Sequence, residues 1–323
     1  MMKNKIDASN VLLTTCSNSN KEESLLIVTD PTTYDVARIL WDAAENYPHK
    51  SMIMMDERTM HGQDPNKMVA AAMANADVIF GATKFSLFHS NARREAVKKG
   101  ARFVNMVDYK VSMFSKGGLF VDFEEQGKLC SYLGEIMRGD KITITTEKGT
   151  NFTASIKGRE PVPQYGRSLN PGDSSSPPDI ECASCAVEGT ANGVVYIDGS
   201  IPHPQLGLIT DEIKLTIKDS RVVSITGGKQ AEILSSVMQG FDDDNVFWVG
   251  EIGIGLNPEC ELNGNMLEDE GCAGTVHFGF GSNTGFHGKI DSQYHLDMVF
   301  RSPTVTIDGK ELLHEGEVVG FNE

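Results

Sequence analysis

The amino-acid sequence predicts an α/β domain with a parallel sheet, followed by a mostly β domain of the α+β type. Two patterns carry this prediction. Short apolar runs alternate with helical periodicity up to about residue 140, and strand and turn patterns dominate beyond it. The length of 323 residues also suits two domains, since typical domains have about 100–200 residues. We therefore expect domains at residues 1–140 and 141–323.

Strands and helices alternate in the first domain. Residues 25–28 form a continuous Leu-Leu-Ile-Val run, which is typical of a strand buried on both faces. Asp30 and Pro31 follow, and this pair resembles a helix N-cap with proline at the first helical position. The other strands are expected at residues 51–55, 77–80 and 101–106, and the helices at 34–46, 65–76, 90–99 and 124–138. Repeated alternation implies right-handed crossover connections and hence a parallel sheet.

Strands and turns dominate the second domain. Residues 141–146 and 151–157 alternate apolar and polar side chains around a Glu-Lys-Gly turn, which predicts a β-hairpin. Residues 159–180 contain five prolines and a Ser-Ser-Ser run, so we expect a long loop that acts as a lid or linker. Further strands are expected at residues 193–197, 212–217, 222–226, 274–281, 294–300 and 303–307, with a helix at 229–239.

The charge of the chain excludes several classes of partner. There are 29 Lys and Arg residues against 45 Asp and Glu residues, which gives a formal net charge of −16. Nucleic acids and anionic membrane surfaces attract clustered cations, so neither is expected as a partner. The excess of carboxylates instead leaves ligands for cations. No window holds the roughly 18 apolar residues that a membrane helix needs, and the polar N-terminus lacks a signal-peptide core, so we expect a cytoplasmic protein.

Two motifs that would indicate a cofactor are absent or incomplete. The first strand-to-helix turn, residues 28–34, lacks the glycines through which a backbone approaches a dinucleotide pyrophosphate. Cys182 and Cys185 form a single Cys-x-x-Cys motif, whereas a zinc ribbon needs a second pair. Cys260 and Cys272 are 12 residues apart and do not supply that pair. We therefore interpret these cysteines as small buried side chains.

The second domain carries histidines and carboxylates that together suit a divalent metal. His295 and Asp297 are two residues apart in an expected strand, so their side chains project from one face about 6–7 Å apart. His277 lies in an alternating strand with glycines that allow close approach. Glu251 lies in an otherwise apolar segment, where an unpaired carboxylate would be costly. Glu188 follows the long loop. These residues are our candidate metal ligands.

Each candidate also has a purely structural interpretation. A His-x-Asp pair can be hydrogen-bonded within a core, and His277 can be a buried histidine with a polar partner. Glu251 can pair with an arginine such as Arg301. Glu188 can be an ordinary carboxylate at the start of a strand. Two further histidines lie in loops expected near these residues and are weaker candidates for contact with a substrate: His203 and His287.

Several segments of the second domain resemble the aminopeptidase T type of thermophilic aminopeptidases. The similarity spans about residues 140–320 and is carried by residues 187–193, 197–200, 250–258, 265–270, 274–279 and 295–297. The resemblance implies an N-terminal Rossmann-like domain, a mostly β domain that binds two divalent metals such as zinc, manganese or cobalt, and a homodimer. The implied ligands are Glu188, Glu251, His277, His295 and Asp297, with Glu251 as the bridging ligand and Glu251 and His277 as catalytic residues.

One position departs from the peptidases, which have a tyrosine seven residues after the first histidine, where this chain has Thr284. The same superfamily includes 2,5-dihydroxypyridine 5,6-dioxygenase, which holds one non-haem iron through two histidines and an aspartate. His295 and Asp297 match two of these ligands, and the remaining histidine aligns with Glu251. The dioxygenase lacks a counterpart of His277.

This ligand set favours hydrolysis. We therefore expect a metallohydrolase that cleaves a peptide or amide bond of a small molecule or short peptide with a metal-activated water. An Fe(II) ring-cleaving dioxygenase of the 2,5-dihydroxypyridine type is the alternative. A non-catalytic protein that binds a metal or a small ligand is a third possibility.

Overall fold

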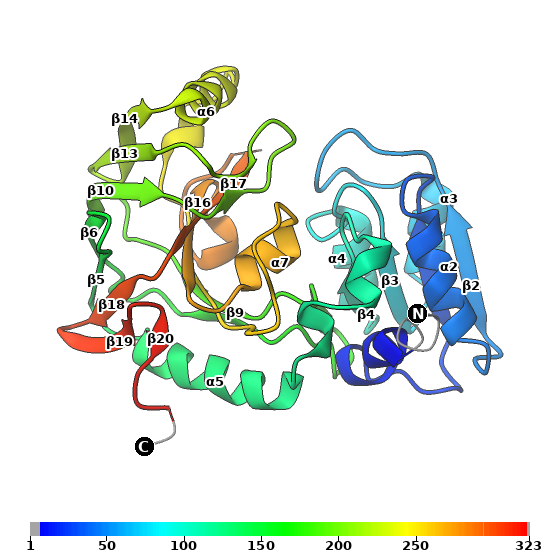
Figure 1. Ribbon diagram of the computed structural model, residues 1–323. Coiled ribbons are helices and arrows are strands. Elements are labelled where there is room, and N and C mark those ends of the chain that lie inside the picture. Colours follow the sequence, from blue (N-terminus) through cyan, green and yellow to red (C-terminus); the bar gives the residue numbers. More distant parts are fainter. Residues whose placement is uncertain (1–6, 293, 322–323) are drawn as a thin grey trace. The chain divides into compact units, whose positions relative to one another are not determined.

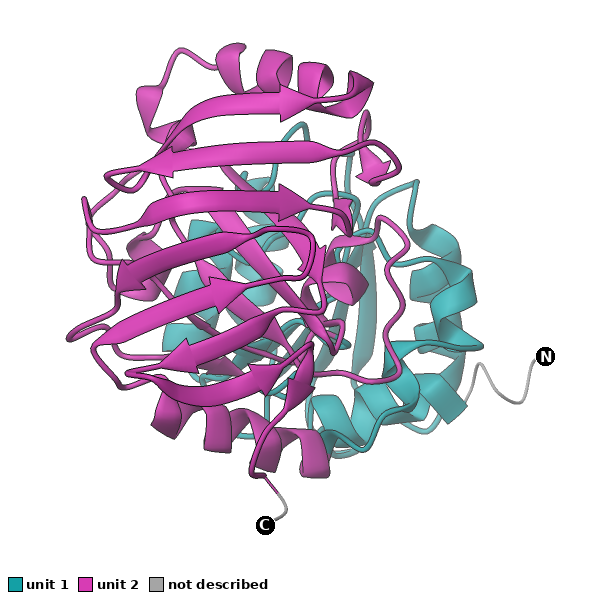
Figure 2. Ribbon diagram, turned by 60° about the vertical axis from the view of Figure 1, so that its left-hand side comes forward, with its two compact units in different colours: residues 1–123, 165–178 teal, residues 124–164, 179–323 magenta. Residues whose placement is uncertain are grey.

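The computed structural model describes residues 7–292 and 294–321. The chain forms two compact units, shown in teal and magenta in Figure 2. Unit 1 comprises residues 1–123 and 165–178, and unit 2 comprises residues 124–164 and 179–323. The sequence led us to expect a single passage between domains near residue 140. Instead the chain passes between the units after residues 123, 164 and 178.

The described part of unit 1 contains a five-stranded parallel sheet in the order β2-β1-β3-β4-β8. Its strands are β1 (Leu25–Thr29), β2 (Lys50–Met54), β3 (Val78–Ala82), β4 (Arg102–Asn105) and β8 (Ser174–Ser175). Every residue of β1 and β3 is buried, as expected for central strands that are covered on both faces. The expectation of a parallel sheet is thus confirmed.

Helices connect these strands. They are α2 (Tyr34–Ala43), α3 (Lys67–Met73) and α4 (Asn91–Lys98). The shorter helix η1 (Val11–Cys16) precedes β1, and η2 (Val111–Phe114) and η3 (Gly118–Phe120) follow β4. The side chain of Asn66 accepts hydrogen bonds from two backbone N–H groups at the start of α3, and Ser90 does the same once for α4. Asp30 does not cap α2, which begins after Thr33. Its carboxylate instead accepts the backbone N–H groups of Thr32 and Lys84.

The described part of unit 2 contains two antiparallel sheets. The eight-stranded sheet has the order β14-β13-β10-β6-β5-β18-β19-β20, and the seven-stranded sheet has the order β12-β11-β17-β16-β15-β9-β7. Figure 1 labels most of these strands. The strands of the first sheet are β5 (Lys141–Thr145), β6 (Asn151–Ser155), β10 (Asn192–Ile197), β13 (Ile213–Lys218), β14 (Arg221–Gly227), β18 (Thr304–Ile307), β19 (Lys310–His314) and β20 (Glu317–Val318). Those of the second are β7 (Val162–Gln164), β9 (Glu181–Ser184), β11 (Ser200–Ile201), β12 (Gly207–Leu208), β15 (Ile252–Gly255), β16 (Thr275–Gly281) and β17 (His295–Arg301).

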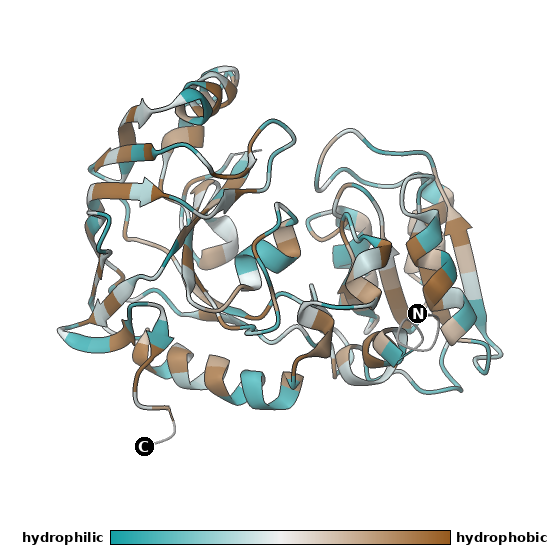
Figure 3. Cartoon of the chain, in the orientation of Figure 1, coloured by the Kyte–Doolittle hydropathy of each residue, from teal (hydrophilic) through white to brown (hydrophobic). Residues whose placement is uncertain are grey.

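The helices of unit 2 are α5 (Phe123–Ile136), which enters the unit at Glu124, α6 (Lys229–Gln239), α7 (Met266–Gly271), η4 (Asp244–Phe247) and η5 (Thr284–Phe286). Polar and apolar residues both occur along α2 and α5 (Figure 3), as expected of helices with one face toward a core. Among the described residues, no helix combines the length and apolar character that crossing a membrane would require.

The expected hairpin is confirmed, since β5 and β6 pair antiparallel. The expectation of an unstructured loop over residues 159–180 is wrong in part, because β7 and β8 lie within it. The sequence concealed both strands because prolines interrupt the alternating pattern around them. Each occupies the edge of its sheet, where a residue such as Pro163 in β7 is tolerated without a backbone N–H.

Candidate metal centre

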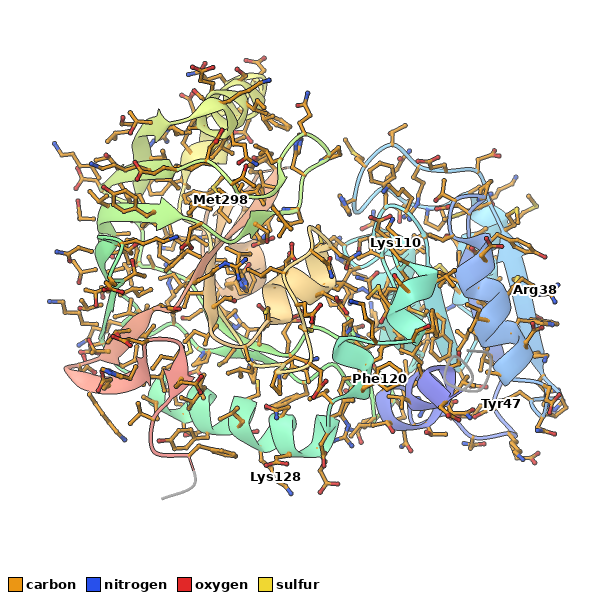
Figure 4. The ribbon with its side chains drawn as sticks, in the orientation of Figure 1. Arg38, Tyr47, Lys110, Phe120, Lys128 and Met298 are labelled. Carbon is orange, nitrogen blue, oxygen red and sulfur yellow. The ribbon has the colours of Figure 1, made fainter. Side chains whose placement is uncertain are left out.

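The candidate ligands come from adjacent strands of the seven-stranded sheet. β17, β16, β15 and β9 are neighbours in that order. His295 and Asp297 lie on β17 and His277 lies on β16, while Glu251 directly precedes β15 and Glu181 begins β9. Side chains alternate along a strand, so the buried neighbour of Asp297, labelled as Met298 in Figure 4, projects to the opposite face.

Glycines clear the space that these side chains occupy. Gly253 on β15 is opposite His277, and a Cβ atom there would lie 2.1 Å from Nε2 of that imidazole. Gly279 on β16 is opposite Asp297. A Cβ atom at Gly279 would lie 2.6 Å from Nε2 of His295 and 2.9 Å from Oδ1 of Asp297. The ligand side chains therefore lie over a backbone that has no side chain at these points.

Glu251 lies between two histidines. Its Oε2 is 3.0 Å from Nε2 of His295, and its Oε1 is 3.5 Å from Nε2 of His277. On the outer sides, His295 Nε2 lies 3.3 Å from Oδ1 of Asp297, and His277 Nε2 lies 3.0 Å from Oε2 of Glu181. Two groups result, each with ligand atoms within 4.8 Å of one another: Glu181, Glu251 and His277 form the first, and Glu251, His295 and Asp297 form the second.

Most of these side chains are buried, which strengthens their electrostatic interactions, whereas 35% of the His295 side chain is exposed. Burial alone would lower the pKa of both histidines, but the neighbouring carboxylates raise the pKa of His277 and His295 well above the ordinary value. Burial would raise the pKa of Asp297, but His295 and His277 hold it well below its usual range. Burial dominates at Glu181, whose pKa is raised. Protons on the imidazoles thus offset the buried negative charge, and a divalent cation would offset it in their place.

The donor set fits a divalent metal ion. Three buried atoms of these groups are common metal ligands: Oε2 of Glu181, Nδ1 of His277 and Oδ1 of Asp297. Nδ1 of His277 makes no hydrogen bond among the described residues, and the two oxygen atoms face imidazole nitrogens at 3.0 and 3.3 Å. Carboxylate and imidazole ligands together suit several first-row metals. Two further carboxylates lie close by, those of the buried Asp179 and the half-buried Glu270. Both have raised pKa values, chiefly because of desolvation.

Glu181 is a residue that the sequence analysis missed. It follows the proline-rich segment directly and precedes Cys182, so its strand was hidden at the end of the expected loop. The available signal was a single carboxylate next to apolar residues, the same signal that singled out Glu251. Pairing of β9 with β15 is what brings Glu181 beside the other ligands.

The described structure brings four of the five predicted ligands together and leaves Glu188 outside both groups. Oε2 of Glu188 pairs with Nη2 of Arg159 at 2.5 Å. Its Oε1 accepts the backbone N–H of Lys289 at 2.9 Å and Nδ2 of Asn283 at 3.2 Å. These hydrogen bonds and the arginine lower the pKa of Glu188 against the opposing effect of burial.

The remaining candidates lie in other settings. Arg301 does not pair with Glu251, because its backbone N–H and Nε donate to Asp198. His203 accepts a backbone hydrogen bond within a turn. His287 is exposed, with a φ of 64°, and its carbonyl oxygen accepts from Arg159. All six cysteines are buried, and no disulfide joins them among the described residues, in keeping with their interpretation as small core residues.

Comparison with known proteins identifies similar chains. A family model described as 2,5-dihydroxypyridine 5,6-dioxygenase matches residues 42–320. The protein named 2,5-dihydroxypyridine 5,6-dioxygenase from Pseudomonas putida is 24% identical over 268 residues, which cover 80% of this chain and 75% of that protein. The solved structure of the P. putida KT2440 2,5-dihydroxypyridine dioxygenase aligns with a TM-score of 0.85 and 20% identity, covering 99% of this chain and 98% of that one. Wild-type AmpT from Thermus thermophilus aligns with a TM-score of 0.71 and 14% identity, covering 98% and 99%.

Proposed function

The chain belongs to the 2,5-dihydroxypyridine 5,6-dioxygenase family, and we propose that it is a metal-dependent dioxygenase that opens a hydroxylated heteroaromatic ring. The observation that carries the proposal is the family match over residues 42–320, because this range contains both groups of candidate ligands. The relative from P. putida, by its name, supports the same class of reaction.

Membership of this family overturns the expectation of an aminopeptidase-like metallohydrolase, which was wrong. The error has a physical reason. Carboxylate and imidazole ligands suit several divalent metals, so such a set does not by itself distinguish hydrolysis from oxygen chemistry. The relationship to aminopeptidase T holds for the fold, which the Thermus structure shares.

We propose that Glu251, His295 and Asp297 hold an Fe(II) ion. Their ligand atoms lie within 4.8 Å of one another, and the buried Oδ1 of Asp297 faces Nε2 of His295 at 3.3 Å. Bound there, Fe(II) would supply the redox chemistry that joins O₂ to an electron-rich ring. Since the family resemblance aligns a histidine with Glu251, this chain would hold the metal through one imidazole and two carboxylates.

The neighbouring residues would orient the ligands and leave one side open. Glu251 and Asp297 are buried, whereas 35% of the His295 side chain is exposed, so a small aromatic molecule would approach past this imidazole. His277 Nε2 lies between oxygen atoms of Glu181 and Glu251. A proton held at this nitrogen would keep the Glu251 carboxylate oriented toward His295.

Oxygen consumption tests the proposal. Protein loaded anaerobically with Fe(II) would be mixed with 2,5-dihydroxypyridine and with isomeric dihydroxypyridines in an oxygen electrode. We expect O₂ uptake that matches loss of the ring absorbance, and both atoms of ¹⁸O₂ in the product. Glu232→Gln, at an exposed position of α6, serves as the matched control for Glu251→Gln. A fully iron-loaded protein without O₂ uptake on any dihydroxypyridine would contradict the proposal.

We further propose that the chain assembles as a homodimer, as the resemblance to the superfamily implies. Sedimentation velocity measured over a range of protein concentrations would test this assembly. A sedimentation coefficient of a 35.2 kDa monomer at all concentrations would contradict it.

A further inference from the structure

A short segment between β16 and β17 lies against the second ligand group. This segment, residues 282–290, contains η5 and is called the 282–290 loop below. The ring of Phe286 in this loop stacks on the imidazole of His295, with ring centroids 6.2 Å apart and an angle of 26° between the planes. Phe286 is half-buried, and it is the aromatic ring stacked against a candidate ligand. The position of the loop therefore determines what covers His295.

Asn283 organises the loop from inside. Its Oδ1 accepts the backbone N–H of Ile290 at 2.7 Å, and its carbonyl oxygen accepts the N–H groups of Phe286 and Gly288. A Cβ atom at Gly288 would lie 2.0 Å from the side-chain amide carbon of Asn283, so only glycine leaves room for this arrangement. The loop is thus closed on itself by a buried amide.

Glu188 and Arg159 hold the loop from outside. Glu188 accepts hydrogen bonds from Lys289 and Asn283, as described above, and pairs with Arg159. Arg159 Nη1 also donates to the carbonyl oxygen of His287 at 2.5 Å. The side chains of Arg159 and Glu188 are only 11% and 21% exposed, so water screens their interaction less than it screens an exposed ion pair.

The thiol of Cys185 makes another contact with the loop, at Phe286. Sγ of Cys185 donates to the carbonyl oxygen of Phe286 at 3.0 Å. The loop is therefore contacted at three of its residues: at Phe286 by Cys185, at His287 by Arg159 and at Lys289 by Glu188.

We propose that Arg159 and Glu188 are positioning residues, which hold the 282–290 loop so that Phe286 covers His295 and forms an aromatic wall beside the candidate metal group. Neither residue belongs to a ligand group in the described structure. The role of the wall rests on the proposed function, since a planar heteroaromatic substrate would stack on an aromatic face. Glu188 as a metal ligand is the competing interpretation.

The first experiment needs neither metal nor turnover. The experiment is NMR spectroscopy of metal-free protein with isotope-labelled histidine. The ring current of Phe286 shifts the C–H resonances of His295. These resonances are identified by their absence from the spectrum of His295→Gln. Phe286→Leu removes this shift. We expect Arg159→Met and Glu188→Ala to move the same resonances toward their positions in Phe286→Leu. Arg38→Met, which breaks an exposed ion pair with Asp42 in the other unit, should leave them in place. Unmoved resonances in both Arg159→Met and Glu188→Ala would overturn the proposal.

Rescue by a conservative variant separates the two interpretations of Glu188. Glu188→Gln keeps an oxygen that accepts the Lys289 and Asn283 hydrogen bonds, so we expect it to keep most of the His295 shift and nearly all of the metal affinity. Glu188→Ala should release the loop. If Glu188 were itself a metal ligand, both variants would lose metal affinity at least about tenfold. That result would overturn the positioning role.

Steady-state kinetics tests the wall. We expect Phe286→Leu and Arg159→Met to raise KM for the aromatic substrate about threefold to tenfold with a smaller change in kcat, because stacking acts on the bound ring. A loss confined to kcat would overturn the wall. Normal turnover by wild type with unmoved His295 resonances in the variants would refute the positioning role alone. A different result would be that the His295 resonances move in the variants while the wild-type protein takes up no O₂. This result would refute the proposed function and the role of Phe286 as a wall, but the anchoring of the loop by Arg159 and Glu188 would stand.

Discussion

Oε2 of Glu251 lies 3.0 Å from Nε2 of His295, although the two residues are 44 positions apart in the sequence. The other oxygen of the same carboxylate faces His277 at 3.5 Å. One side chain is therefore shared between both candidate ligand groups. A change at Glu251 is expected to affect both groups, whereas a change at Asp297 acts on one.

Replacing Glu251 tests whether this carboxylate binds metal. Glu251→Gln keeps the size of the side chain and removes its charge, so we expect metal affinity to fall at least about tenfold. His295→Ala and Asp297→Ala should each cause a comparable loss. Elemental analysis after dialysis at a fixed free metal concentration measures the effect. Full metal content in Glu251→Gln would show that the ion binds elsewhere.

Adding a methyl group at Gly279 should displace the ligands without removing any of them. The new Cβ atom would lie 2.6 Å from Nε2 of His295, which is too close for atoms that are not bonded. We expect Gly279→Ala to lose metal at least about tenfold while the circular dichroism spectrum is retained. Gly134→Ala in α5 is the matched control, because the nearest atom outside its own helix, Sγ of Cys182, would lie at an ordinary contact distance of 3.9 Å from the added carbon. Equal metal content in the two variants would contradict the geometry described here.

The Cys-x-x-Cys motif should be dispensable for metal binding. Burial raises the pKa of the Cys185 thiol to about 11, so it is not a thiolate at neutral pH. Cys182 lies within β9 and is fully buried. We therefore expect the double variant Cys182→Ser with Cys185→Ser to keep the metal content of wild type. Loss of zinc or iron from that variant, measured in the folded protein, would show that the cysteines bind metal.

His61 in unit 1 should make stability depend on pH. Burial lowers the pKa of His61 below 6.5, the cation Arg58 lowers it further, and Asp108 opposes both. Nδ1 of His61 accepts the N–H of Ser86 at 3.1 Å. A lowered histidine pKa means that the unfolded chain binds a proton more readily than the folded one. The contribution of neutral His61 to the free energy of unfolding is fully present above 6.5, the pKa of histidine in the unfolded chain. It is lost as the pH falls below 6.5 toward the lower pKa of the folded protein.

The effect of His61 is isolated by comparison with a variant that does not titrate. The difference in thermal midpoint between wild type and His61→Gln should shrink by a few degrees as the pH is lowered from about 7.5 to about 5.5. A difference that is the same at both pH values would contradict this account. Comparing the two proteins cancels the contributions of the other histidines.

Local patterns predicted the regular elements well. The expected strands at 193–197, 212–217, 222–226, 274–281, 294–300 and 303–307 all agree with the structure to within one residue at each end, and the helix at 229–239 agrees at both ends. Alternation and helical periodicity depend on neighbours in the chain, so a sequence contains them directly. The strands that were not among those expected include β7, β8, β9, β11, β12 and β15. In the edge strands β7 and β8, prolines and serines carry no such pattern.

The candidate site was predictable where it depended on one strand. The pair His295 and Asp297 follows from the two-residue period, and the glycines near His277 correctly indicated close approach. Glu181 was not predictable, because it joins the group only through the pairing of β9 with β15. The reaction class could not be derived either, since the same ligands serve hydrolysis and oxygen chemistry.

The sequence by itself therefore determined the alternating and mostly β halves, the faces of their strands, and the acidic, imidazole-bearing character of the site. Only the tertiary structure decided that Glu181 and Glu251 meet His277, and that Glu188 meets Arg159 and the 282–290 loop. The reason is physical: a strand's faces follow from adjacent residues, whereas the neighbours of a side chain follow from strand order and register. Those depend on burial and pairing between segments far apart in the chain.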